Sequence, residues 1–394
     1  MMSTKVKLAG YAVILIFLLL CAELILFISF NTVPQLKGRF YSVPEVTETE
    51  YEKYIAQRHP VLGWPSEKWL DKNADQDGAR RSPANKVRSE KPVCISLYGD
   101  SFTFSEEVSN SEAWGNLLAE QMNCQVKNYG VGGYGTDQAL LRLQLNIQAG
   151  HAVGDHIVLG LYPDNLRRIH NQWRYLLQSS GGPALNFKPA FVRAEGQLAL
   201  TPLFRGSYKD FRQLSAHPEK YLTGEGYLPN SASFYSRKTL GFPYTLSAFG
   251  LAKNLVGQLR LGSLGDRSNF WNYPIYYDTS KGPDAFKFEI LAHILDQFSD
   301  VCVANQTNCF FLLIPDPELV YQREKTGNHD LSAPILTAMP KEVQFLDATS
   351  IFTDVDHICS SVTKPEKCRG HFNAAGYELL ANFVGREISA NIAE

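Results

Sequence analysis

The hydrophobic and polar positions of this chain predict an α/β domain built on a parallel sheet. Short apolar runs of strand character alternate with segments of helical spacing, and each run ends at a turn. Such strand–turn–helix units are typical of parallel sheets, because parallel strands need a crossover between them. The predicted strands are 93–98, 125–129, 157–162, 309–314 and 343–346, and the predicted helices are 111–122, 136–147, 285–303 and 373–392.

The alternation is interrupted between residues 170 and 285. This stretch is rich in aromatic residues, Gly, Pro and Ser, and it shows no clear period. A loop of that length without secondary structure would be exceptional. We therefore predict that 170–285 is an insertion, a lid or substrate subdomain, over the carboxyl edge of the sheet. It divides the sheet domain into a first part, 91–169, and a second part, 286–394.

One apolar run near the amino terminus is of a different kind. Leu8 to Phe30 contains a single charged residue, Glu23, and as a helix it would span about 34 Å, enough to cross a membrane. The run is too long for a cleaved signal peptide, and Cys21 lacks the small preceding residue of a lipoprotein signal. We predict an uncleaved transmembrane signal anchor within 1–34.

The charges beside this run predict its orientation. Lys5 and Lys7 place the short amino-terminal end in the cytoplasm. The protein is then expected to cross the cell inner membrane once, with its carboxyl-terminal domain in the periplasm or extracytoplasmic space. Residues 35–90 are polar and irregular and predict a stalk that packs on the domain. Glu23 is either an intramembrane contact site or, as we favour here, a carboxyl group tolerated near the outer end.

The composition narrows the functional class. Hydrophobic residues make up 44% of the chain and charged residues 20%, which excludes an intrinsically disordered protein. Lys and Arg number 38 against 40 Asp and Glu, so no basic excess exists to bind nucleic acid. One long apolar run also excludes a polytopic membrane protein. A globular domain attached to the membrane by one amino-terminal helix remains.

The cysteines agree with an oxidising compartment. Apart from Cys21 they are even in number: Cys94, Cys124, Cys302, Cys309, Cys359 and Cys368. Closeness along the chain suggests 302–309 and 359–368, which leaves 94–124, although sequence alone does not choose among the pairings and unpaired core cysteines are the alternative. No cluster of Cys and His has the spacing of a zinc site, so we predict no metal.

A serine follows the first predicted strand, in the turn Gly99-Asp100-Ser101. A serine between a buried strand and a helix is exposed at the carboxyl edge of the sheet, where open α/β folds place their ligands. The backbone N–H groups that follow can stabilise an oxyanion. An ordinary turn is the alternative interpretation of so short a motif.

A glycine-rich turn follows the second predicted strand, with glycines at 130, 132, 133 and 135. Glycines of this density let the backbone approach a small group closely. A dinucleotide-binding loop is the competing interpretation, because glycines 130, 132 and 135 have the G-x-G-x-x-G spacing, but the next predicted strand, 157–162, contains no acidic residue to bind a ribose. An ordinary glycine-rich turn is the other alternative.

Two further candidates lie at the ends of later elements. Asn165 follows the third strand, where an amide can donate a hydrogen bond to a developing oxyanion. His371 enters the last predicted helix, which Asn373 is placed to cap. A lone histidine is usually structural, but one that accompanies a serine, a glycine and an asparagine at strand ends is a better candidate for a general base.

These four blocks, in this order, resemble the SGNH (GDSL-type) hydrolase superfamily over about 93–165 and 285–390. The resemblance implies a three-layer, flavodoxin-like parallel sheet, with Ser101 as nucleophile and His371 as general base. It assigns the oxyanion hole to the Ser101 backbone, Gly133 and Asn165. The surrounding sequence resembles membrane-anchored members associated with bacterial surface polysaccharides, which implies polysaccharide-export or modification proteins as partners.

Two positions depart from the pattern of that superfamily. The third block usually reads Gly-x-Asn-Asp, whereas here the asparagine of Asp164-Asn165 stands one place late. The aspartate of the triad stands three residues before the histidine, and that position is Cys368. We predict that Asp356, or Asp354 second, replaces it, brought close by a 359–368 bridge. A backbone carbonyl that orients the histidine is the alternative.

Taken together, the residues predict a serine-dependent ester hydrolase or O-acyltransferase. It would act through an acyl-serine on acyl groups, expected to be O-acetyl, of a cell-envelope polysaccharide, without a cofactor. The alternative, motivated by Cys368, is a catalytically inactive glycan-binding or polysaccharide-assembly factor on the same fold. Aromatic residues of the insertion are candidates for stacking on sugars, although most are expected in its core: Trp173, Tyr175, Phe187, Phe191, Tyr227, Phe234, Tyr235, Trp271, Tyr276 and Tyr277.

Overall fold

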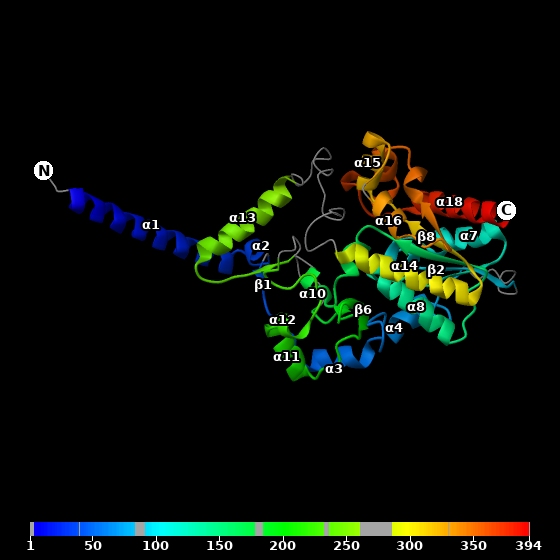
Figure 1. Cartoon of the computed structure of the whole chain (residues 1–394), viewed down its shortest axis with the longest axis horizontal. Coiled ribbons are helices and arrows are strands. Elements are labelled where there is room, and N and C mark those ends of the chain that lie inside the picture. Colours follow the sequence, from blue (N-terminus) through cyan, green and yellow to red (C-terminus); the bar gives the residue numbers. More distant parts are fainter. Residues whose placement is uncertain are drawn as a thin grey trace.

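A five-stranded parallel sheet forms the centre of the molecule (Figure 1). The computed structural model describes residues 4–38, 40–82, 91–177, 184–231, 236–260, 286–329 and 331–393. The strands lie in the order β3-β2-β4-β8-β9, and every neighbouring pair is parallel. Their bounds are β2 Val93–Tyr98, β3 Gln125–Asn128, β4 His156–Leu161, β8 Asn308–Leu313 and β9 Val343–Asp347.

Helices cover both faces of this sheet and make it the middle of three layers. α8 (Thr136–Gln148), α14 (Phe286–Asn305) and α16 (Ser332–Ala338) pack on one face, and α7 (Trp114–Met122) and α18 (Ala374–Ala393) pack on the other. Successive residues of a strand point to opposite faces. Leu159 of β4 accordingly enters the core beneath α8 and α14, whereas Val158 enters the core beneath α7 and α18.

The predicted α/β class, the parallel sheet and its three layers are therefore confirmed. The strands match the predicted runs to within a residue at almost every end, and the Asn373 side chain caps α18 by accepting a hydrogen bond from Gly376 N at 3.1 Å. The predicted helix over 111–122 is shorter than expected. Its first turn is a separate 3-10 turn, Asn110–Glu112, and α7 begins at Trp114.

Short elements gather at the carboxyl edge of the sheet. α6 (Ser101–Phe104) follows β2, and α9 (Asn165–Arg168) follows β4. α15 (Pro317–Thr326) follows β8, and α17 (Val355–Ser360) and the antiparallel pair β10 (Val362–Lys364) and β11 (Arg369–Phe372) follow β9. The pair leads directly into α18.

The stalk is more ordered than its polar sequence predicted. It contains α2 (Pro34–Lys37), β1 (Phe40–Tyr41), α3 (Glu48–Gln57) and α4 (Glu67–Asn73). Thr47 and Glu50 form a reciprocal capping box at the start of α3. Its later part packs on the sheet domain, where Lys127 of β3 forms ion pairs with Asp75 at 2.7 Å and Asp77 at 2.6 Å.

The insertion also has secondary structure of its own. Its elements are α10 (Arg174–Leu177), β5 (Ala190–Ala194), β6 (Gln197–Thr201), α11 (Tyr208–Ala216), α12 (Pro218–Tyr221), β7 (Lys238–Thr239) and α13 (Tyr244–Arg260). It is tied to the sheet domain by the fully buried ion pair of Lys188 with Asp137 at the start of α8.

Most of the insertion aromatics proposed to stack on sugars are core residues. Trp173, Tyr175, Phe187 and Tyr227 are buried in one cluster with residues of α3 and α11, and Phe191 is buried beneath α14. Their rings are therefore not available to a saccharide. Phe234, Tyr235, Trp271, Tyr276 and Tyr277 lie outside the described residues.

The apolar run at the amino terminus forms one long helix, α1 (Thr4–Thr32), which projects from the rest of the molecule in Figure 1. Its segment Gly10–Thr32 is long and apolar enough to cross a membrane. The favoured interpretation of Glu23, a carboxyl group merely tolerated in the helix, was wrong, because its side chain accepts hydrogen bonds from the first residues of α13.

The three predicted disulfides are confirmed. Cys94 is bonded to Cys124, Cys302 to Cys309, and Cys359 to Cys368. The first joins β2 to the entrance of β3, and the second joins the end of α14 to β8. The third joins α17 to the residue that precedes β11, so it constrains the segment that carries His371.

Candidate active site

Ser101 is the first residue of α6, at the carboxyl end of β2. Its position is fixed by Asp100, which caps α6: one carboxylate oxygen accepts a hydrogen bond from Phe102 N at 2.9 Å. Ser101 itself is 5% exposed. The short helix therefore presents the serine at the sheet edge through a cap that is itself buried.

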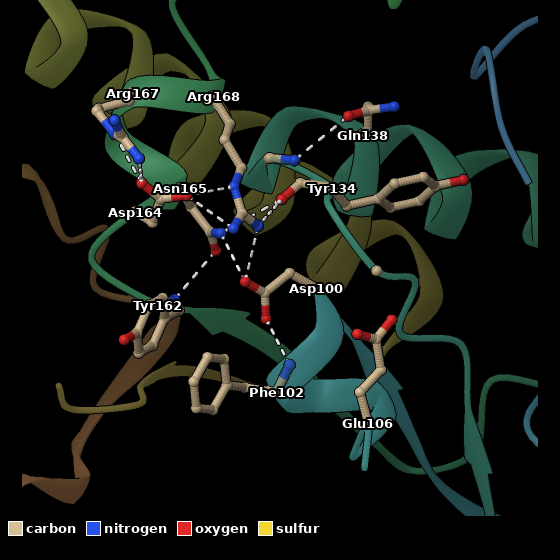
Figure 2. Close-up of polar contacts among 12 residues, drawn as sticks. Asp100, Phe102, Glu106, Tyr134, Gln138, Tyr162, Asp164, Asn165, Arg167 and Arg168 are labelled. Carbon is tan, nitrogen blue, oxygen red and sulfur yellow. Dashed lines mark hydrogen bonds and ion pairs between the residues drawn. The ribbon is translucent and has the colours of Figure 1, made fainter. Parts of the chain in front are cut away.

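The second carboxylate oxygen of Asp100 receives two donors from α9 (Figure 2). Asn165 Nδ2 donates to it at 2.9 Å, and a guanidinium nitrogen of Arg168 donates to it at 3.0 Å. Arg168 also donates to the Tyr134 carbonyl at 2.9 Å. This buried network joins the loops after β2, β3 and β4, which carry the serine, glycine and asparagine blocks.

The side chain of Asn165 is fully committed within that network. Its amide nitrogen donates to Asp100 and, at 3.3 Å, to the Tyr134 carbonyl, while its oxygen accepts from Tyr162 N at 3.0 Å. Asn165 thus positions Asp100 in this structure, and its N–H groups are not directed at an open oxyanion site.

The preceding residue, Asp164, is held by two cations. Its carboxylate bonds to the guanidinium groups of Arg167 and Arg168. Burial alone would raise the pKa of Asp164, but the two positive charges outweigh it and hold that pKa well below its usual value. The segment that contains Asp164 and Asn165 therefore presents a carboxylate neutralised by arginines. It does not present an amide that is free to bind an oxyanion.

The glycine-rich turn packs directly on the serine helix. A side chain on Gly130 would meet the backbone of Phe104 and Asp100, at 2.4 and 2.9 Å, and Gly133 has φ +78°, which favours glycine. In the described part of the chain, neither Ser101 N nor Gly133 N donates a backbone hydrogen bond. Both N–H groups remain available as oxyanion donors.

Two residues that the sequence did not single out lie beside Gly133. A Cβ at that glycine would be 3.9 Å from Arg174 and 3.9 Å from the Trp64 indole. Trp64 belongs to the stalk, is only partly buried and donates to the Gly132 carbonyl at 3.0 Å. Arg174 belongs to the insertion, and its Nη1 atom is buried without a hydrogen-bond partner in the described structure.

The environment of Arg174 disfavours its positive charge, because the guanidinium is buried and lies near another cation. Burial, and secondarily the neighbouring Arg168, lower the pKa of this guanidinium to about 10. It is still a cation at neutral pH. A buried cation with one unpaired nitrogen beside the glycine turn is suited to stabilise negative charge on a bound group.

His371 lies on β11, where two glutamates from the loop after α6 approach it. Its Nδ1 is 3.4 Å from a carboxylate oxygen of Glu107, and that same oxygen accepts a hydrogen bond from Thr363 Oγ1 at 2.5 Å. This hydrogen bond is the main cause of the lowered pKa of Glu107. Its carboxylate is therefore ionised at neutral pH and is fixed beside the histidine ring.

The second glutamate, Glu106, lies on the other side of the ring. One of its oxygens is 3.6 Å from His371 Nε2, and a Cβ at Gly132 would be 2.1 Å from the other. Burial raises the pKa of Glu106, and His371 opposes that rise. Glu106 thus lies between the histidine and Gly132 of the glycine-rich turn.

The structure brings the four predicted blocks to one edge of the sheet. The Phe102 ring lies 4.9 Å from the His371 ring, so the serine helix and the histidine strand are in contact. Within the described residues, no hydrogen bond joins Ser101 Oγ to His371. The contacts of the His371 ring are with Glu106, Glu107 and Phe102.

The two acids predicted to support His371 lie at the start of α17. Asp354 caps that helix by accepting from His357 N at 2.8 Å, and Asp356 is exposed in its first turn. The role of Asp356 stays a prediction. Glu107 lies 3.4 Å from His371 Nδ1, a buried nitrogen that has no hydrogen-bond partner in the described structure.

The solved structures that are similar to this chain include the following two. One is a lipolytic protein of the G-D-S-L family from Desulfitobacterium hafniense DCB-2, with 10% identity and a TM-score of 0.34, covering 75% of this chain and 98% of its own. The other is a carbohydrate esterase family 2 enzyme with a carbohydrate-binding domain from Corynascus thermopiles (Myceliophthora fergusii), with 12% identity and a TM-score of 0.31, covering 80% and 68%.

At these identities and TM-scores, neither neighbour's family or activity is transferred to this chain. No protein-family model matches the chain, and no curated protein is similar to it in sequence.

Proposed function

We propose that this protein is a serine esterase or O-acyltransferase. The observation that carries the proposal is the pair of uncommitted backbone N–H groups, Ser101 N and Gly133 N, on two loops packed against each other at the carboxyl edge of the sheet. Oxyanion stabilisation needs donors of this kind, fixed before the substrate arrives. A buried serine begins the same helix, and a histidine lies beside it.

In the proposed reaction Ser101 Oγ attacks the acyl carbonyl while His371 accepts the hydroxyl proton. The oxyanion is held by the two backbone N–H groups and by the positive charge of Arg174, which takes the place of the committed Asn165 amide. The imidazolium returns its proton to the leaving oxygen, and the acyl group stays on the serine. Water or a sugar hydroxyl then removes it.

Glu107 is the proposed acid of the triad. It lies at Nδ1, the ring position that a triad carboxylate holds, and it is anchored independently by Thr363. Glu106 is placed at Nε2, where the serine must approach, so its carboxyl has to move aside when substrate binds. Hydrogen bonds of catalytic residues are commonly long in unliganded enzymes and tighten in the complex.

The proposed substrate is an acylated, O-acetyl-bearing glycan of the cell envelope. Trp64 supports this choice, because its partly exposed indole lies beside Gly133, next to the proposed oxyanion site. A flat aromatic surface there suits a sugar ring. Trp64→Ala should raise KM for an acetylated oligosaccharide and leave KM for p-nitrophenyl acetate close to the wild-type value.

A second candidate function is acyl-glycan binding without turnover. It is favoured by the placement of Glu106 at His371 Nε2 and by the disulfide of Cys368 at the position of the usual acid. Hydrolysis of p-nitrophenyl acetate by the full chain in detergent separates the two functions.

For an enzyme, Ser101→Ala should lower that rate by at least about 10³-fold and abolish labelling by a fluorophosphonate. Ser111→Ala, at an exposed serine, is the matched control and should keep both. If the wild type and Ser101→Ala release product equally, the binding function stands.

We also propose that α1 is a single-pass anchor of the inner membrane, with the sheet domain outside the cytoplasm. The three disulfides and the two lysines before the apolar segment support this orientation. A reporter that matures only in an oxidising compartment, fused after Glu394, should be active. Activity of a cytoplasm-specific reporter at the same position would reverse the orientation.

A further inference from the structure

Glu23, the only acidic or basic residue in the apolar segment Gly10–Thr32 of α1, has a specific partner in the insertion. The Glu23 carboxylate accepts hydrogen bonds from Tyr244 N at 2.5 Å, from Thr245 N at 3.0 Å and from Thr245 Oγ1 at 2.5 Å. Phe27, one turn further along α1, packs its ring 5.3 Å from that of Tyr244. These contacts join segments more than two hundred residues apart in the sequence.

The contact lies well inside the apolar segment that is proposed to cross the membrane. Glu23 precedes the end of that segment, Thr32, by about 13 Å along the helix axis. In hydrocarbon, every backbone N–H needs a partner within the protein. The first N–H groups of a helix have none inside the helix. Glu23 supplies partners for two such groups of α13, and the positive helix terminus in turn stabilises the carboxylate.

The first part of α13 is apolar on two faces. Tyr244, Ala248 and Leu251 face the base of α1, where they pack with Phe30 of α1 and Phe40 of β1. The other face carries Phe242, just before the helix, and then Leu246 and Phe249. These three side chains are 74%, 68% and 75% exposed. A helix that is apolar all round is typical of a segment in a core or in a membrane.

The chain enters and leaves this region beside α1. Before it, β7 pairs in parallel with β1, through Lys238 with Phe40 and Thr239 with Tyr41. The chain then reaches the level of Glu23, and α13 runs back toward the domain, as Figure 1 shows. The backbone groups of Gly241 at the bend are satisfied locally, because Ser247 Oγ accepts from its N–H at 3.4 Å and donates to its carbonyl at 3.0 Å.

We propose that residues 241–251 form a re-entrant membrane segment. Its outward face, Phe242, Leu246 and Phe249, lies among the acyl chains of the outer half of the bilayer that α1 crosses. Lipid is the occupant because the segment packs against α1 at the level of Glu23, where the neighbouring residues Leu24 and Ile25 are 59% and 62% exposed and would themselves face lipid. The inference rests on the proposed anchor and is independent of the proposed chemistry. The insertion thus gives the sheet domain a second attachment to the membrane.

The test measures the environment of a spin label at position 246. Full-length Leu246→Cys, in a Cys21→Ser background, is labelled with a nitroxide and reconstituted in phospholipid nanodiscs. Leu336→Cys is the matched control, because Leu336 is an equally apolar residue, 57% exposed, on α16 of the sheet domain. The label at 246 should be relaxed by oxygen and shielded from a water-soluble nickel complex, and the label at 336 should show the reverse.

Two outcomes would overturn the proposal. A label at 246 as accessible to nickel as the one at 336 would place the segment in water. Spin–spin broadening that disappears on dilution with unlabelled protein would place a second copy on this face instead of lipid. Hydrolysis of p-nitrophenyl acetate, measured on the same samples, reports the catalytic proposal separately, so either proposal can fail alone.

The role of Glu23 is tested in the same labelled protein. Glu23→Leu removes the acceptors of α13, so the label at 246 should become more mobile and more accessible to nickel, while the label at 336 is unchanged. Glu23→Gln keeps one oxygen acceptor and should lie closer to the unsubstituted protein. If Glu23→Leu leaves the label at 246 unaltered, the carboxylate does not hold the segment.

Discussion

The serine half and the histidine half of the candidate site are built in opposite ways. Around Ser101, Asp100 is 1% exposed, and Asn165 and Arg168 donate to its carboxylate in a buried network. Around His371, the side chains of Glu106 and Glu107 are 38% and 41% exposed, and each lies more than 3.3 Å from a ring nitrogen. The first half is fixed before substrate arrives, whereas the second has room to rearrange.

This difference assigns different tasks to the two halves. A buried and fully bonded network holds backbone donors still, which is what oxyanion stabilisation requires. A partly buried histidine between two half-exposed carboxylates can exchange partners when Glu106 is displaced. Substitutions in the buried network of Asp100 should therefore act mainly on the fold, and substitutions of the two glutamates beside His371 should act mainly on turnover.

The largest expected effect is on the serine half. Asp100→Ala removes the cap of α6 and leaves the buried charge of Arg168 without one of its two carboxylate partners, which should cost about 3–5 kcal/mol of unfolding free energy. Chemical denaturation measures the loss. Asp71→Asn, at an exposed carboxylate of α4, is the control and should change stability by less than about 0.5 kcal/mol. Equal stabilities would show that the buried network is not structural.

The next effect separates Glu107 from Asp356. Glu107→Gln should lower kcat for p-nitrophenyl acetate by about 10²- to 10⁴-fold with the fold retained, because it removes the charge beside Nδ1. Asp356→Asn should stay near the wild-type rate. The reverse ranking would return the triad role to Asp356, and equal, small losses would leave a backbone carbonyl as the group that orients the histidine.

The sheet and the Ser101 turn were predictable because their signals are local. A buried strand is an apolar run, and a serine at its end lies on the edge of the sheet whatever the loops do. The α3 helix could also have been predicted, because Thr47 and Glu50 have the spacing of a capping box. The polar composition of the stalk drew attention away from that signal.

The placement of Glu107 beside His371 was not predictable by the same means. The prediction of Asp356 depended on the 359–368 bridge, whereas Glu107 comes from the loop after α6 and precedes His371 by 264 residues. Only the packing of β10 and β11 against that loop places the two together. Arg174 and Trp64 were missed for the same reason, because the insertion and the stalk supply them from outside the motif blocks.

A smaller effect compares two disulfides of similar loop length. Cys359–Cys368 and Cys302–Cys309 have sequence separations of 9 and 7. Removing either one by Cys→Ser pairs should cost about 2–3 kcal/mol of unfolding free energy. Loss of 359–368 should also lower kcat, since that bridge constrains the strand of His371, whereas loss of 302–309 should leave kcat unchanged. An equal drop in kcat for both variants would mean that turnover depends no more on the disulfide beside His371 than on a disulfide elsewhere in the sheet domain.

The smallest effect is the dependence of stability on pH at Glu107. Its pKa is lowered in the folded state, chiefly by the hydrogen bond from Thr363, from an ordinary value of 4.5. A group with a lowered folded pKa stabilises the fold above its unfolded pKa, and that contribution is lost as the pH falls through the folded value. Because the side chain is 41% exposed, the contribution should stay below about 1 kcal/mol.

The measurement compares wild type with Glu107→Gln by denaturation at several pH values. Wild type should be the more stable protein at pH 7, and the gap should close as the pH falls below 4.5. Thr363→Val removes the hydroxyl that causes most of the shift, so the Glu107→Gln substitution in that background should show a smaller gap. A difference in unfolding free energy that is constant with pH would mean that the charge of Glu107 does not fix the position of its side chain. Its place beside His371 Nδ1 would then have to result from packing alone.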